Sequence, residues 1–143
     1  MNSPVLVIAA IHNQRDQFLE EGSISQGRTM TRLLFPFVTN QAGFDTGIAI
    51  SNVSSDPFGT EQQDGNCTIH YYGRMIDGSA PLRRQASSVI RAGEQLTFNL
   101  SSGGTGLISA TPGFTGYLIA ECRFKASGFA FLSDLGARRI GSC

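Results

Sequence analysis

Cysteine and histidine are the side chains of this sequence best able to bind a metal or to form a covalent link. The chain has three cysteines, Cys67, Cys122 and Cys143, and two histidines, His12 and His70. No two of them stand at the spacing of a zinc site, so we expect no metal and no cofactor. Cys67 and Cys122 share faces with apolar residues on two separate predicted strands. They could be reduced core residues, but we favour a disulfide because the composition is that of an exported protein.

The tripeptide Asp45-Thr46-Gly47 suggests a second kind of chemistry. In aspartic proteases the same tripeptide supplies two carboxylates, one from each half of a dimer, which share a proton and activate water. Here a glycine-containing turn precedes Asp45, and the nearest downstream match to those enzymes, "FLSDLG" at 131–136, is interrupted by polar residues. We therefore predict that Asp45 accepts hydrogen bonds from backbone N–H groups in a turn. A dimeric aspartic protease is kept as a remote alternative, and we expect no enzyme.

Three Asn-X-Ser/Thr sequons mark candidate sites for covalent glycans, at Asn52, Asn66 and Asn99. Asn99 points away from the apolar side of its predicted strand. Asn66 lies in a predicted turn, and the acidic residue two positions before it is favoured in bacterial N-glycosylation. Asn52 is the weakest candidate, because it falls on the same side of its strand as two isoleucines.

Short strands separated by turns must position these residues. Apolar alternation recurs after residue 30, with Gly-, Pro-, Asn- and Asp-rich clusters between the alternating segments and no long helical period. We therefore expect an all-β fold, a single Ig-like or jelly-roll-like β-sandwich over residues 31–143. Pro36 indicates a sheet edge or a bulge, and His70 should face solvent. The predicted strands are 32–38, 46–53, 67–73, 88–93, 94–100, 116–124 and 128–135.

Residues 1–30 differ from this pattern and form an N-terminal arm. Its predicted strand, residues 4–11, contains an unbroken apolar run. A strand with one solvated face alternates, so this run needs cover on both of its faces. The polar segment that follows, up to residue 30, is predicted to be a tether. The residues of the run expected to make the contacts are Val5, Leu6, Val7, Ile8 and Ile11.

The composition excludes several classes of protein. With 11 basic and 11 acidic residues the formal net charge is zero, which argues against a nucleic-acid partner. Charged residues make up only 15% of the chain, a low value that is typical of turn-rich extracellular or cell-surface β proteins. The longest apolar run is too short to span a membrane. The N-terminal run lacks the basic region of a signal peptide, so an export signal was removed or the chain begins inside a longer protein.

Four stretches of the chain carry a resemblance to a known family. They are "LLFPFVTNQAGFDTGIAISNVSSDPFG" at 33–59, "CTIHYYG" at 67–73, "AGEQLTFNL" at 92–100 and "PGFTGYLIAECRFKASGFAFLSDLG" at 112–136. In order and spacing they resemble a largely uncharacterised bacterial family of secreted or cell-surface domains. The resemblance implies an exported β-sandwich with a Cys67–Cys122 bridge, and it supplies no catalytic residues. The N-terminal arm and Cys143 lie outside it.

These observations favour a structural function. The apolar strand of the arm could complete the sandwich of a neighbouring subunit, which is donor-strand insertion. Repeated head to tail, this contact gives a homopolymeric filament outside the cell. The same strand could instead complete its own domain, and this alternative stays open. A second interpretation is a secreted module that binds glycans or a cell surface, in which Tyr72, Tyr117 and Phe114 would stack on sugar rings.

Overall fold

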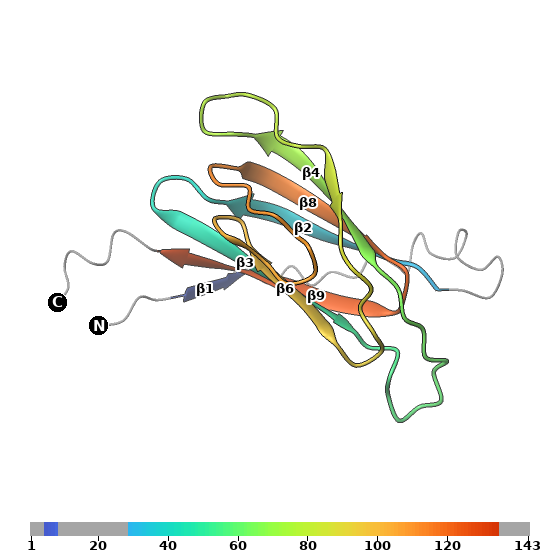
Figure 1. Ribbon diagram of the computed structural model, residues 1–143. Coiled ribbons are helices and arrows are strands. Elements are labelled where there is room, and N and C mark those ends of the chain that lie inside the picture. Colours follow the sequence, from blue (N-terminus) through green and yellow to red (C-terminus); the bar gives the residue numbers. More distant parts are fainter. Residues whose placement is uncertain (1–4, 9–28, 135–143) are drawn as a thin grey trace.

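The computed structural model describes residues 5–8 and 29–134, which form two antiparallel β-sheets packed against each other (Figure 1). This part of the chain contains nine strands and no helix, which confirms the predicted all-β sandwich. Accordingly, no helix within it is long and apolar enough to cross a membrane. The strands are β1 (Val5–Ile8), β2 (Thr31–Thr39), β3 (Phe44–Asn52), β4 (Cys67–Arg74), β5 (Arg84–Ala86), β6 (Gln95–Asn99), β7 (Gly103–Gly104), β8 (Thr115–Cys122) and β9 (Ala126–Asp134).

One sheet has five strands and the other has four. The five-stranded sheet has the order β1-β9-β3-β6-β7, and the four-stranded sheet has the order β2-β8-β4-β5. Successive strands along the chain often lie in different sheets, as β2 and β3 do and as β8 and β9 do. The central strands of both sheets therefore come from distant parts of the sequence, and the connecting loops gather at the two ends of the sandwich.

The core lies between the sheets and is built from alternate residues of each strand. Ile48 and Ile50 of β3 are almost fully buried, and so are Leu96 and Phe98 of β6 in the same sheet. Leu33 of β2 is among the buried residues that the other sheet contributes. Because side chains alternate between the two faces of a strand, the polar residues between these positions lie on the outer faces. The alternation that predicted the strands thus corresponds to the inward and outward faces.

Two details of the sequence prediction need comment. Pro36 was expected at an edge or a bulge, and both are found, because β2 is an edge strand and its register with β8 shifts between Phe35 and Val38. The strand expected at 88–93 is wrong, since this segment makes only an isolated bridge between Ile90 and Gly65. β5 and β7 were not predicted, because strands of three and two residues are too short to show alternation.

β1 lies at one edge of the five-stranded sheet, beside β9 (Figure 1). The pairing is antiparallel, with Val5 opposite Ser133 and Ile8 opposite Ala130. It covers part of the strand predicted at 4–11, whereas Ile11 and the tether up to residue 28 lie outside the described residues. Within the part of the chain that the structure describes, β1 pairs with β9 and with no other strand.

Candidate functional site

Asp45, the residue that suggested proteolysis, is buried near the start of β3. Its carboxylate accepts hydrogen bonds from the backbone N–H groups of Thr46 (2.9 Å) and Ser101 (3.1 Å), and from the Ser101 hydroxyl. The expected bonds to backbone N–H groups are therefore confirmed, although Asp45 lies inside a strand and not in a turn. The residue is only 7% exposed. Its carboxylate thus has little free surface with which to share a proton with a second carboxylate.

The two residues after Asp45 also hold the fold together. The Thr46 hydroxyl donates to the Thr39 carbonyl oxygen (2.9 Å) and accepts from the Thr39 N–H (2.8 Å), which links β3 of one sheet to β2 of the other. Gly47 leaves room for the ring of Phe131 on β9, because a Cβ at this position would overlap that ring. Each member of the tripeptide therefore has a structural role.

Cys67 and Cys122 form a disulfide, as predicted. They face each other on the neighbouring strands β4 and β8, with a Cα–Cα distance of 4.0 Å. The N–H and C=O groups of Cys67 both bond to Ser87, on the side away from β8. The two cysteines are therefore a non-hydrogen-bonded pair, in which facing residues approach most closely. The disulfide is fully buried, links two strands of one sheet and fixes their register.

The three sequons lie in different surroundings. Asn52 is 1% exposed, and its side-chain Nδ2 donates to the carbonyl oxygens of Gln63 (2.9 Å) and Ile90 (3.0 Å). Glycans attach at this nitrogen, so its burial and hydrogen bonds disfavour the candidate site at Asn52, which no observation tests directly. Asn99 is exposed on the outer face of the five-stranded sheet, and Asn66 is partly exposed just before β4. Glycosylation at these two residues stays a prediction.

The aromatic residues expected to stack on sugars separate into two groups. Tyr72 on β4 and Tyr117 on β8 lie opposite each other on the outer face of the four-stranded sheet, 45% and 41% exposed. Their rings stack, with centroids 5.1 Å apart and planes 18° apart. Phe114 is fully buried, where it makes an edge-on contact with Tyr71, so its predicted exposure is wrong. Phe37, in the bulge of β2 opposite Tyr117, is 45% exposed instead.

A pair of glycines brings the strands close together beside the tyrosine pair. Gly73 and Gly116 face each other in the β4–β8 ladder, one position from Tyr72 and Tyr117. A Cβ at Gly116 would overlap the Tyr72 carbonyl oxygen, and a Cβ at Gly73 would overlap the Thr115 carbonyl oxygen. No larger residue fits this approach without a backbone shift. The position of the tyrosine stack therefore depends on the absence of a Cβ atom at these two neighbouring positions.

Glu121 connects three strands on the same outer face. Its carboxylate accepts a hydrogen bond from Arg32 on β2 (3.1 Å) and lies 3.0 Å from the Nε2 atom of His70 on β4. Partial burial alone would raise the pKa of Glu121, but the hydrogen bonds and charges of His70 and Arg32 together lower that pKa. His70 lies on the outer face, as expected. The acidic group on this face is thus already engaged by basic partners.

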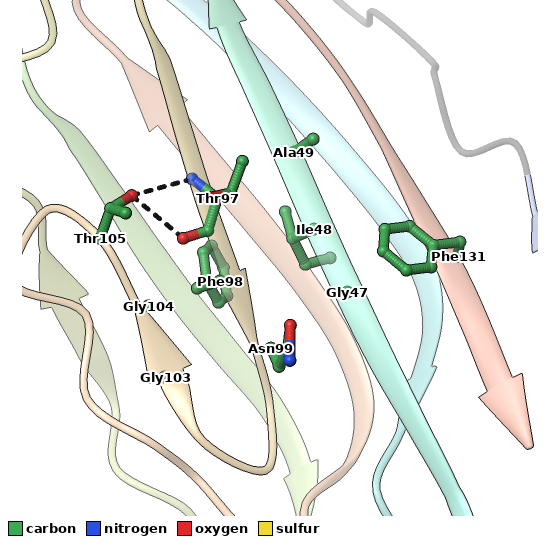
Figure 2. Close-up of a pocket in the computed structure, with 10 residues that line it drawn as sticks. All are labelled: Gly47, Ile48, Ala49, Thr97, Phe98, Asn99, Gly103, Gly104, Thr105 and Phe131. Carbon is green, nitrogen blue, oxygen red and sulfur yellow. Dashed lines mark hydrogen bonds between the residues drawn. The ribbon is translucent and has the colours of Figure 1, made fainter. Parts of the chain in front are cut away.

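The outer face of the five-stranded sheet carries a shallow hollow of about 240 Å³ over β3. Figure 2 shows Thr97 and Asn99 on β6 and Phe131 on β9, with β3 and Gly47 between them. Thr105 lines the hollow beside β6, where its hydroxyl accepts a hydrogen bond from the Thr97 N–H and donates one to the Thr97 carbonyl oxygen. The described residues that line the hollow include no ionisable side chain.

Two exposed arginines on the four-stranded sheet were missed by the sequence analysis. Arg74 follows Tyr72 by two positions on β4, and Arg84 on β5 lies opposite His70. Alternation along β4 could have placed Arg74, but Arg84 could not be placed while β5 was unrecognised.

No group of three or more potential metal ligands occurs among residues 5–8 and 29–134.

Comparisons with known proteins add little to this geometry. No family model matches the sequence, and no curated protein matches it either. One solved structure, that of infectious bursal disease virus strain Gx, aligns with 96% of this chain at 12% identity and a TM-score of 0.36. The aligned region covers 34% of the viral chain, so this chain spans about a third of the length of that protein.

Proposed function

We propose that the chain is an extracellular structural subunit that assembles head to tail when its β1 strand inserts beside β9 of a neighbouring subunit. The observation that carries the proposal is the position of β1. It is an edge strand of the sheet, it pairs with β9 alone among the described strands, and residues 9–28 separate it from the rest of the fold. Exchange of such an element between identical chains is a low-cost route to assembly.

Exchange of β1 between two copies keeps the same backbone hydrogen bonds that β1 and β9 form within one chain. A β1 strand from a second copy can form the same antiparallel ladder with β9, with the same residue opposite Ser133. The free energy of the ladder is then nearly equal in the two arrangements, and protein concentration decides between them. When a subunit gives its strand to one neighbour and accepts a strand from another, the contact is heterologous and extends into a filament, whereas reciprocal exchange between two subunits closes into a dimer. The buried disulfide suits an oxidising compartment, which supports an extracellular location.

A cysteine pair across the ladder tests this proposal. In a Cys143→Ser background, Val5→Cys and Ser133→Cys place thiols at facing positions of β1 and β9. Head-to-tail exchange predicts a ladder of covalent multimers on a non-reducing gel after mild oxidation, and a product that stops at the dimer would contradict the filament. Insertion within one chain gives only a cross-linked monomer, and that result at all protein concentrations would overturn the proposal.

A matched control uses Val5→Cys with Ser51→Cys, because Ser51 lies on β3 opposite Ser127 and away from the β1 edge. This pair should form no specific cross-link. Deletion of residues 1–11 gives a second measurement. The truncated chain should stay a monomer in light scattering and should unfold at a lower temperature, whereas polymers of the truncated chain would contradict the role of β1.

A second candidate function is a glycan- or surface-binding module, and the exposed Tyr72–Tyr117 stack favours it. Each ring has one face covered by the other, which leaves the outer faces of the stack and the two hydroxyl groups for a ligand. A glycan array with Tyr117→Ala tests this function. Phe129→Ala is the matched control, because Phe129 is also 41% exposed but lies on the other sheet. Equal binding by both variants would remove the tyrosine stack from the site.

A further inference from the structure

We infer that the outer face of the four-stranded sheet binds an acidic polysaccharide, through the Tyr72–Tyr117 stack together with Arg74 and Arg84. The inference rests on the second candidate function and names the class of its ligand. It depends on two arginines that form no ion pair among the described residues and that lie beside exposed aromatic rings on one sheet face.

The β-ladders place these residues next to one another. Tyr72 and Arg74 are two positions apart on β4 and both are exposed, so their side chains project from the same face about 7 Å apart. Arg84 lies opposite His70, which precedes Tyr72 by two positions, so Arg84 is a diagonal neighbour of Tyr72. Tyr72 thus has one arginine further along its own strand and another on the adjacent strand, with Tyr117 on its third side.

The charges of this face favour an anionic ligand. Glu121 is already bonded to Arg32 and His70, and Asp77, in the loop after β4, bonds to the N–H and hydroxyl groups of Ser79. The guanidinium groups of Arg74 and Arg84, in contrast, form no ion pair or side-chain hydrogen bond with any residue that the structure describes. Guanidinium groups bind carboxylates with two parallel hydrogen bonds, so these two arginines are suited to acidic groups.

The combination of rings and arginines favours a sugar polymer with carboxylates. A uronic acid ring has an apolar face of C–H groups that can lie on tyrosine, and its carboxylate can reach an adjacent arginine. The outer face of the five-stranded sheet differs, because the hollow on it is lined by uncharged residues. Single-stranded nucleic acid also combines bases with charge, but the zero net charge of the chain disfavours it.

Calorimetric titration of the full chain with a short alginate oligosaccharide tests the inference, with a dextran oligosaccharide of matched length as the neutral probe. We expect binding to alginate that weakens as NaCl is raised, and much weaker binding to dextran. The double variant Arg74→Gln/Arg84→Gln should lose about tenfold in affinity. Arg91→Gln, an exposed arginine in the turn before β6, is the control and should bind as the unmodified chain does.

Three results would overturn the inference. Equal binding to dextran and alginate would leave a glycan-binding module but remove the acidic ligand. Tighter binding to a single-stranded oligonucleotide would assign the face to nucleic acid. Absence of binding to every probe would remove both the ligand class and the second candidate function. None of these results bears on the exchange of β1, which the cysteine cross-links test separately.

Discussion

The buried disulfide should supply a large part of the stability of this domain. Cys67 and Cys122 are 55 positions apart, and a link that closes a loop of this length removes about 4 kcal/mol of conformational freedom from the unfolded chain at 25 °C in the chain-entropy model. For a chain of 143 residues, whose unfolding entropy scales with length, this free energy corresponds to about 13 °C in Tm. The free energy of unfolding of a native domain is about 5–15 kcal/mol in total, which exceeds this loss, so the reduced protein should still fold.

Urea unfolding at neutral pH, with and without reductant, measures this contribution. Reduction of the native protein removes the link but keeps both sulfur atoms, so its loss of stability reports the cross-link alone. Cys67→Ala/Cys122→Ala also removes buried atoms and should lose about 1 kcal/mol more. Both measurements use the Cys143→Ser background, so that no third thiol can exchange. A loss below about 1 kcal/mol on reduction would refute the loop argument.

Three further changes test individual contacts. Asp45→Ala leaves the N–H groups that Asp45 binds without their acceptor and should cost about 2 kcal/mol in urea unfolding; loss of a proteolytic activity without loss of stability would instead support the protease alternative. Gly116→Ala forces β8 away from the Tyr72 carbonyl and should cost about 2–3 kcal/mol, and an unchanged stability would contradict the close approach. Asp56, whose pKa is lowered to about 2 chiefly by its hydrogen bond from Thr60, stabilises the fold above the ordinary pKa of 3.8, and this stability is lost as pH falls towards 2. Asp56→Asn should therefore flatten the pH dependence of unfolding between pH 4 and 2, and an unchanged slope would contradict this role.

The sequence predicted the inward face of the sandwich better than its outer faces. Apolar alternation located six strands and placed Cys67 and Cys122 in the core, because burial on one face leaves a strict period of two. Phe114 was misplaced because it lies outside the strands, where no period says which way a side chain points. Arg84 was missed because three residues of β5 carry no pattern of their own, and its position is set only by pairing with β4.

The tripeptide at Asp45 shows a different limit of sequence reasoning. Three residues match a catalytic motif, yet each is accounted for by a contact with another strand or loop. These partners are Ser101, Thr39 and Phe131. Ser101 and Phe131 are far from the tripeptide in sequence, and Thr39 lies on the other sheet, so no local pattern reports these contacts. A short motif therefore needs its structural surroundings before it indicates a reaction.

The β1–β9 ladder also has a consequence for the kinetics of folding. β1 is synthesised first and β9 last among the described strands, so their pairing closes a loop of nearly the whole chain. Contacts of such high sequence separation form late, after the other strands have assembled. During that interval β9 presents an unpaired edge that β1 of another chain can occupy. The local concentration of newly made chains at this moment would then decide whether the product is a monomer or a filament.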